Sequence, residues 1–398
     1  MFSSLGHIAG RPQLLVLALM IFVQGSAYGS TLPYLSVTAI GELGMSEKAY
    51  SLLVFVSSLA AVTISVSLGI LSDTVGDRRQ MIIALSLMGI AGYGAIFLFP
   101  SIPVFIGATA LVIPFFNAVA SLIFVSARAE TADFPPTEAA SINATLRAFI
   151  SAAWVIMPAA LGLALAGSAS MLGAWGVAGL CALFIFLCSA FLLKGQPPRP
   201  AQNRASSGFF AALKELGAPI MLARMISMAS ITATIRLSAT VWPLILTLEL
   251  GGKTSDVGLI AGMTALIEIP FMLIWAGLLK RFSILSIIVA AALLYGCYMT
   301  ALSFAAAPWH IYALSVPGAA AAAALLAMPL NYFQELFPGR PGLGTAFNPI
   351  NSFLGNAITA VTFAAGSHYL GYSGTIQLGV ALALAGISIL ITVERVLR

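Results

Sequence analysis

The sequence predicts an all-α integral membrane protein with twelve transmembrane helices in two pseudo-symmetric six-helix bundles. Of its 398 residues, 60% are hydrophobic and only 8% are charged, and the mean hydropathy is +1.03. An ordinary soluble domain is about a quarter charged, so this chain has too few polar side chains to cover a water-exposed surface. The long apolar runs indicate helices, because lipid admits only helices or closed barrels and these runs are too long for barrel strands.

Turn residues and charges divide the chain into twelve apolar runs, each close to the length of about 20 residues that a spanning helix needs. The expected spans are 12–37, 45–69, 80–99, 101–125, 138–167, 170–193, 217–248, 253–278, 282–304, 309–333, 341–366 and 371–394. We expect an N-terminal six-helix bundle over 1–193, a cytoplasmic linker rich in Pro, Ser and basic residues over 194–216, and a C-terminal six-helix bundle over 217–398.

The basic residues predict the orientation, because cytoplasmic loops of membrane proteins carry an excess of Lys and Arg. If the N-terminus is cytoplasmic, the outer side carries only Lys48 and Lys253. The cytoplasmic side then carries Arg11, Arg78, Arg79, Arg128, Lys194, Arg199, Arg204, Lys214, Lys280, Arg281, Arg340, Arg395 and Arg398. We therefore expect both termini in the cytoplasm. This spread over short loops also argues against a nucleic-acid partner, despite a pI near 9.2.

Few residues suit enzyme chemistry. The three cysteines lie inside apolar runs, and the three histidines are scattered over the N-terminus and outer loops, so we expect no metal site. A glycine-rich phosphate-binding motif with its lysine is absent from the sequence, which argues against ATP as the energy source. The sequence therefore predicts a protein that is not an enzyme and that holds no cofactor.

Prolines and asparagines inside the apolar runs fall in spans 1, 4, 5, 7, 8, 10 and 11, and in none of spans 3, 6, 9 and 12. Amides and freed backbone groups are tolerated at membrane depth where protein or a wet cavity satisfies them, so this segregation predicts a central cavity. Amides and aromatics in such a cavity suit a neutral polyhydroxylated ligand. The candidate substrate-binding residues are Gln24, Tyr28, Asn117, Asn143, Trp154, Arg236, Trp242, Asn331, Asn348, Asn351 and Asn356. The alternative interpretation is that these side chains join neighbouring helices.

Three charges stand well inside the spans: Arg147, Arg236 and Glu268. A charge at the bilayer centre costs roughly 2.5–3.5 kcal/mol, so each one requires a reason. Glu268 is interpreted as a proton-titrating site whose partner is Arg147 or Arg236, and the alternative is a permanent structural ion pair. Arg224 lies near the cytoplasmic end of span 7 and is expected to reach the interface.

The loop after span 2, "GILSDTVGDRR" (69–79), carries charges of both signs. The arginines follow the orientation rule, but that rule does not explain Gly69 or Asp73. Gly69 allows close helix approach, and Asp73 could accept hydrogen bonds from the N-terminus of a neighbouring helix, such as span 11. We interpret Gly69, Asp73, Arg78 and Arg79 as a gate that holds the outward-facing state.

This loop resembles the signature G-x-L-[SA]-D-x-x-G-R-R of the major facilitator superfamily, from which it departs at Asp77. Four further stretches are similar to the bacterial sugar efflux transporter family of that superfamily. They are "SARAETAD" (126–133), "LRAFISAAWVIMPAALGLAL" (146–165), "GMTALIEIPFML" (262–273) and "FQELFPGRPGLGTAFNPINSFLG" (333–355).

The resemblance implies two six-helix bundles that alternate access, and export of sugars or glycosides against inward proton flow. The residues at matching motif positions are Asp73, Arg78, Arg147, Trp154, Pro158, Glu268, Pro270 and Asn351. Met157 stands where the family has Gly, and Arg236 has no counterpart, which leaves the substrate open. The superfamily fold packs span 5 against span 8, which favours Arg147 as the partner of Glu268.

The sequence thus predicts a monomeric secondary transporter in a bacterial inner membrane that exports sugars or related neutral polar solutes, coupled to protons. Its expected partners are a small-molecule substrate, the proton and the lipid bilayer. One alternative is a multidrug or anionic small-molecule exporter, in which Arg236 binds the ligand charge. Another is a non-transporting sensor, which would have no need for the charged loop or the intramembrane charges.

Overall fold

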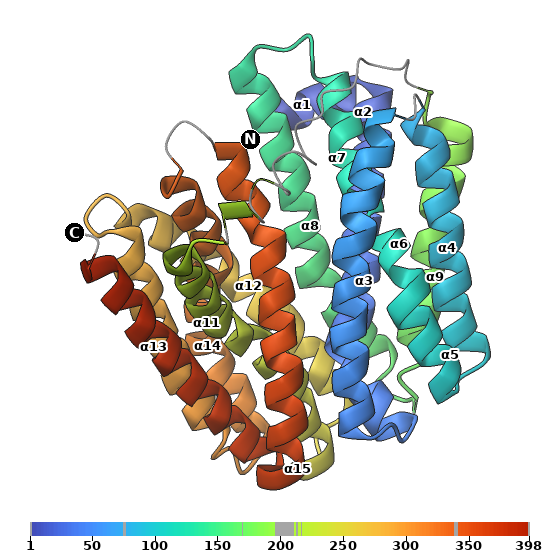
Figure 1. The fold of residues 1–398 in the computed structure, drawn as a ribbon. Helices are drawn as coiled ribbons and strands as arrows, with labels where there is room; N and C mark the ends of the chain where they lie inside the picture. Colours follow the sequence, from blue (N-terminus) through green and yellow to red (C-terminus); the bar gives the residue numbers. More distant parts are fainter. Residues whose placement is uncertain are drawn as a thin grey trace.

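The computed structural model describes residues 2–74, 77–168, 170–195, 211, 214–215, 217–337 and 341–396. Within these residues the regular structure is helical. Figure 1 shows two groups of roughly parallel and antiparallel helices beside each other, the N-terminal half in blue to green and the C-terminal half in olive to red. The expected linker over 194–216 falls largely outside the described residues, so the domain boundaries stay a prediction.

The N-terminal half begins with a short helix, α1, and continues with six membrane spans, some of them built from several consecutive segments. The segments are α1 (Phe2–Gly10), α2 (Pro12–Thr31), η1 (Leu32–Tyr34), η2 (Val37–Glu42), α3 (Glu47–Thr74), α4 (Arg78–Leu98), α5 (Ile102–Gly107), η3 (Ala108–Val112), α6 (Ile113–Asn117), α7 (Val119–Glu130), α8 (Pro136–Ala164), α9 (Gly173–Leu187) and η4 (Cys188–Leu192). Several helices start with proline, which has no N–H to leave unpaired in a first turn.

The C-terminal half repeats this arrangement. Its segments are α11 (Pro219–Leu244), η5 (Ile245–Glu249), α12 (Thr254–Leu278), α13 (Ile284–Leu302), α14 (Pro308–Glu335) and α15 (Pro341–Val396). The first span of each half ends in a π-helical segment, η2 and η5, followed by a glycine with positive φ, Gly44 and Gly251. These matching irregularities show that the two halves share one plan.

Eleven helices among the described residues are long and apolar enough to cross a membrane. The last of them, Leu343–Val396, has 54 residues, which at about 1.5 Å per residue is more than twice the thickness of a hydrocarbon core of about 30 Å. Gly371, with a φ of 70°, interrupts it, and two spans result. The expected twelve spans are therefore confirmed, and an even number places both chain ends on one side, here called the terminal side; the other is the far side.

Candidate functional site

The two halves meet along α8 and α12, which pack backbone against backbone on the far side. A Cβ at Gly162 would lie 2.8 Å from the Ser255 carbonyl oxygen, and one at Gly262 would lie 2.7 Å from the Val155 carbonyl oxygen. At Gly258 a Cβ would overlap the Pro158 carbonyl oxygen. These three glycines form what we call the glycine seam, and their missing side chains allow the close approach.

A second contact between the halves joins α3 to α15. The Asn356 side-chain amide donates a hydrogen bond of 3.0 Å to the Ser58 hydroxyl, near the middle of both spans. Further toward the far side, the rings of Tyr50 and Phe363 lie 5.7 Å apart between centroids. At the far end, the Tyr372 hydroxyl donates to the Glu47 carboxylate over 3.3 Å. The second contact therefore also runs from mid-membrane to the far side.

On the terminal side, residues of the same helices are exposed. Arg147 and Ser151 of α8 are exposed, whereas Pro158 and Gly162 at the seam are buried. Asn348, at the beginning of α15, is exposed as well. The Arg147 guanidinium carbon lies 5.2 Å from the centroid of the Phe124 ring in its own half. The contacts between the halves described above thus lie at mid-membrane and on the far side, while these residues of the same helices are exposed on the terminal side, as in a molecule closed on the far side and open on the terminal side.

Glu268 lies on α12 and is partly buried. Within the described residues, neither Arg147 nor Arg236 lies within 4 Å of its carboxylate, since the ion pairs there are His7–Glu138 and Arg224–Glu394. The glycine seam fixes the alignment of the two antiparallel helices. In this alignment, Glu268 of α12 lies at about the same height as Ile150 of α8. Glu268 is thus within one turn of the height of Arg147, but unpaired with it in this conformation.

Arg236 lies midway along the span formed by α11 and η5 and is partly exposed. Its Nη1 donates to the Thr232 carbonyl over 3.1 Å. A Cβ at Gly355 of α15 would be 3.0 Å from the same nitrogen, so the guanidinium occupies the space that a side chain at 355 would fill. One turn earlier on α15, the buried Asn351 donates through Nδ2 to the Thr232 hydroxyl over 3.3 Å.

The N-terminal half has a polar cluster of its own at a break in the fourth span. Asn117 ends α6 directly before α7 begins. Gln24 of α2, which is 1% exposed, donates through Nε2 to the Phe116 carbonyl over 3.3 Å at this break. Tyr28, one turn along α2 from Gln24, is partly buried. The structure thus places two of the candidate residues, Gln24 and Asn117, at one break in the fourth span.

Several of these amides have an oxygen without a hydrogen-bond partner among the described residues. The buried oxygens concerned are Gln24 Oε1, Asn117 Oδ1, Asn143 Oδ1 and Asn351 Oδ1. Buried polar atoms in proteins are usually paired, so each of these oxygens, on α2, α6, α8 and α15, requires an explanation. Each is an acceptor that a hydroxyl-bearing ligand could satisfy.

The remaining candidate substrate-binding residues have fewer contacts that bear on their role. Trp154 on α8, Trp242 on α11 and Asn331 on α14 are each partly buried on a helix that sequence reasoning assigned to the cavity. Asn348 is exposed on the terminal side. Asn356 differs from them, because its amide is committed to Ser58 across the halves.

The charged loop is described in part. Gly69 and Asp73 lie in the last turns of α3, but their side-chain surroundings fall outside the described residues. Arg79 donates to the Ser189 carbonyl over 2.9 Å and also to the Ala190 carbonyl, both in η4 of its own half. The Nε of Arg78 is buried without a hydrogen-bond partner in the described part of the chain. Asp77 caps α4 by accepting a hydrogen bond of 3.0 Å from the Arg79 backbone N–H.

Three features of the structure were not predicted from the sequence. They are the glycine seam and the Ser58 contact between the halves, and the pairing of Arg224 with Glu394 on the terminal side. The glycine seam and Ser58 were not singled out, because small residues are frequent in every apolar run. Arg224, whose position near the interface stays a prediction, has a partner that was not predicted: its Nε donates to the Glu394 carboxylate over 2.8 Å, and the Tyr332 hydroxyl donates to the same oxygen over 2.7 Å. Glu394 stands near the end of the last run, where an acid is unremarkable in a sequence.

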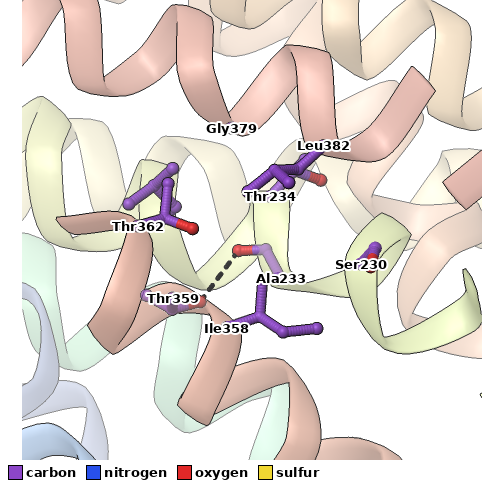
Figure 2. Close-up of a pocket in the computed structure, with 9 residues that line it drawn as sticks. Ser230, Ala233, Thr234, Ile358, Thr359, Thr362, Gly379 and Leu382 are labelled. Atoms are coloured by element: carbon purple, nitrogen blue, oxygen red, sulfur yellow. Dashed lines mark hydrogen bonds between the residues drawn. The ribbon is translucent and has the colours of Figure 1, made fainter. Parts of the chain in front are cut away.

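A small crevice lies inside the C-terminal half, between α11 and the two parts of α15 (Figure 2). It is lined by Ser230, Ala233, Thr234, Leu237, Ile358, Thr359, Thr362, Gly379 and Leu382. The Thr359 hydroxyl donates to the Ala233 carbonyl over 3.1 Å across it (Figure 2). Because α11 and α15 belong to the same half, this crevice is a packing feature of that half and lies outside the contact between the halves. The described residues contain no group of three or more His, Cys, Asp or Glu that could hold a metal ion.

Comparisons with known proteins agree with this architecture. A "Putative sugar efflux transporter" of Deinococcus radiodurans is 28% identical over 381 residues, covering 94% of this chain and 96% of that protein. "Sugar efflux transporter A" of Escherichia coli K12 is 28% identical over 333 residues, with 82% of each chain covered. The crystal structure of the nucleoside transporter NupG superposes with a TM-score of 0.79 at 13% identity, covering 96% of this chain and 98% of that one, and shows the shared fold.

The match to a family extends over most of the chain. Residues 17–360 match the Major Facilitator Superfamily, and they include the glycine seam between the two halves. The family and these relatives indicate a membrane transporter rather than an enzyme. The chain is a multi-pass membrane protein that belongs to the Major Facilitator Superfamily and resembles its sugar efflux transporters.

Proposed function

We propose that this protein exports sugars or related polyhydroxylated solutes from the bacterial cytoplasm in exchange for protons, by alternating access of its two halves. The observation that carries the proposal is the group of unpaired amide oxygens on α2, α6, α8 and α15. Such acceptors suit a ligand rich in hydroxyl groups, and both halves supply them. The similarity over almost the whole chain to proteins named sugar efflux transporters supports the same substrate class.

The terminal side is proposed to face the cytoplasm, because the loops on that side carry the excess of basic residues. The conformation described above is then open to the cytoplasm and ready to take up a substrate for export. In the opposite conformation the glycine seam separates and the terminal ends of α8 and α12 approach each other. The charged loop with Gly69, Asp73, Arg78 and Arg79 is proposed as a gate that holds this second conformation.

Glu268 and Arg147 are proposed as the coupling pair. They stand at nearly the same height on facing helices, and they are apart while the terminal side is open. As the terminal ends of α8 and α12 close, the Arg147 guanidinium approaches the ionised Glu268 carboxylate and stabilises the closed state. A proton arriving from the outer side neutralises Glu268 and weakens that pair, and the protein returns to the cytoplasm-open state with the proton bound. Proton entry and solute exit thereby alternate.

Transport by purified protein in proteoliposomes tests both parts. For molecules with the terminal side outward, an acidic lumen should drive uptake of labelled glucose or lactose, and a protonophore should abolish it. Glu268→Gln should lose this gradient-driven accumulation and keep sugar exchange, because the neutral amide mimics a permanently protonated acid. Glu335→Gln, which changes an exposed glutamate at the end of α14, is the matched control and should behave as the parent protein does.

The two parts fail in different ways. Gradient-driven accumulation that persists in Glu268→Gln would remove Glu268 from the coupling mechanism and leave sugar export standing. Absence of sugar flux and sugar exchange in the parent protein, with intact and correctly inserted protein, would refute the substrate class.

A further inference from the structure

Arg236 is an intramembrane charge that the proposed coupling pair does not use. It sits near the middle of its span, and within the described residues no carboxylate lies within 4 Å of it. Arg224, on the same helix, provides the contrast, because its guanidinium is paired with Glu394. An unpaired guanidinium at membrane depth is costly, and such charges usually mark a substrate or ion pathway.

The guanidinium has most of its hydrogen-bonding capacity left. Of its five N–H donors, one is used on the Thr232 carbonyl. The missing side chain at Gly355 of α15 leaves room for the group, whose Nη1 is 3.0 Å from where a Cβ would stand. Thr232 and Gly355 are buried, whereas Arg236 is partly exposed. The arginine therefore lies against α11 and α15, and its remaining donors have no hydrogen-bond partner among the described residues.

Asn351 adds an acceptor to the same place. It is 3% exposed, and its Nδ2 donates to the hydroxyl of Thr232, the residue whose carbonyl also accepts from Arg236. Its Oδ1 is buried without a partner among the described residues. One residue after Gly355, Asn356 is bonded to Ser58 of the other half. The cluster of Arg236, Thr232, Asn351 and Gly355 therefore lies next to the boundary between the halves, where a transported solute must pass.

We propose that Arg236 and Asn351 form a carboxylate-binding subsite and that the exported solute is a sugar acid, such as a uronate. The Arg236 guanidinium donates two parallel hydrogen bonds to the carboxylate, and Asn351 Oδ1 accepts one from a neighbouring sugar hydroxyl. A single guanidinium balances the single charge of a carboxylate better than the double charge of a phosphate. Arg147, exposed on the terminal side, draws the anion toward the opening before it reaches Arg236. This inference deepens the proposed function and rests on it.

Binding to the purified full-length protein tests the proposal with three closely matched probes. D-glucuronate, D-glucuronamide and D-glucose share a ring and differ at one carbon, which carries a carboxylate, a neutral amide or a hydroxymethyl group, and thermal stabilisation reports each affinity. The parent protein should bind glucuronate roughly tenfold to a hundredfold more tightly than glucuronamide, the range expected for a charge-assisted hydrogen bond. Arg236→Gln should abolish the difference, and Arg236→Lys should keep part of it. Arg128→Gln, which removes an exposed arginine at the end of α7, should keep all of it.

The parent comparison alone can overturn the proposal, even if Arg236→Gln does not fold. Equal binding of glucuronate and glucuronamide would refute the carboxylate subsite, while binding of glucose and glucuronamide would leave sugar export intact. An unchanged preference in Arg236→Gln would assign the anion site to another residue and refute the role of Arg236. Binding of acetate or lactate that depends on Arg236, with no sugar bound, would overturn the sugar acid together with the proposed function.

Discussion

Gly258 of α12 lies so close to the Pro158 carbonyl of α8 that a Cβ at this position would overlap the oxygen. The contact is between the two halves and on the far side, so it exists only while that side is closed. Gly258→Val should therefore disfavour the closed far side. Overpacking typically costs about 1–3 kcal/mol, and each 1.4 kcal/mol shifts an equilibrium about tenfold. We expect a shift of roughly tenfold or more toward a molecule opened on the far side.

The distance between spin labels at Lys48 and Lys253 measures this shift. Both residues are exposed at far-side helix ends, one in each half, and the three native cysteines would first be changed to serine. Gly277→Val is the matched control, because this glycine lies on the same helix and a Cβ there would meet no other atom within 4 Å. An unchanged distance distribution in Gly258→Val would show that the seam does not set the conformation.

The hydrogen bond from Asn356 to Ser58 should contribute a smaller share to the same closure. A neutral hydrogen bond is worth about 0.5–1.5 kcal/mol, so Ser58→Ala and Asn356→Ala should each move the label distances in the same direction as Gly258→Val, by less. In the double variant the effects should not add, because both changes remove one interaction. Ser65→Ala, which changes an exposed serine on the same helix, should have no effect. Fully additive effects would show that the two residues act separately.

The fold could be predicted from the sequence because a lipid bilayer admits few kinds of backbone structure. Apolar runs of about 20 residues must become helices there, and the turn at Gly371 followed from the short interruption between the last two runs. The division into two six-helix halves was likewise predicted, from the polar stretch over 194–216. The glycine seam could not be predicted, because a glycine in an apolar run carries no sign of which helix it will face.

The candidate substrate-binding residues stay a prediction, but the structure shows which of them lie near one another. Gln24 and Asn117 do lie at one break, and Asn351 and Arg236 do meet at Thr232. The Asn351 amide fits both interpretations of an intramembrane amide, helix joining and ligand binding. Its Nδ2 joins α15 to α11, and its Oδ1 has no hydrogen-bond partner among the described residues. The partner of Arg224 was not predicted, because Glu394 is 170 residues away in the chain and a single sequence gives no information on such distant contacts.

The network of Arg224, Glu394 and Tyr332 should stabilise the C-terminal half. The Arg224 and Glu394 side chains are 14% and 17% exposed, so removing one leaves the other poorly solvated. Arg224→Ala should lower the free energy of unfolding by about 1.5–3 kcal/mol, the range for a hydrogen bond to a charged group. The midpoint of thermal unfolding in detergent measures this.

A second substitution separates charge loss from packing loss in this network. The double variant Arg224→Met with Glu394→Leu should recover part of the stability, because no unpaired charge remains. A midpoint that is unchanged in Arg224→Ala, or lower still in the double variant, would contradict a stabilising ion pair.

Arg79 gives the last test, because its contacts indicate an anchor within one half in addition to the proposed gate. Its guanidinium donates to the Ser189 and Ala190 carbonyls of η4, which holds the end of the sixth span against α4 within one half. Arg79→Ala should therefore lower the thermal unfolding midpoint, and Arg79→Lys should restore only part, because an ammonium cannot reproduce the planar fork. The proposed gate role of Arg79 predicts in addition that Arg79→Ala shifts the distance between the labels at Lys48 and Lys253, and an unchanged distance would remove Arg79 from the gate. The two measurements on one variant thus separate the two roles.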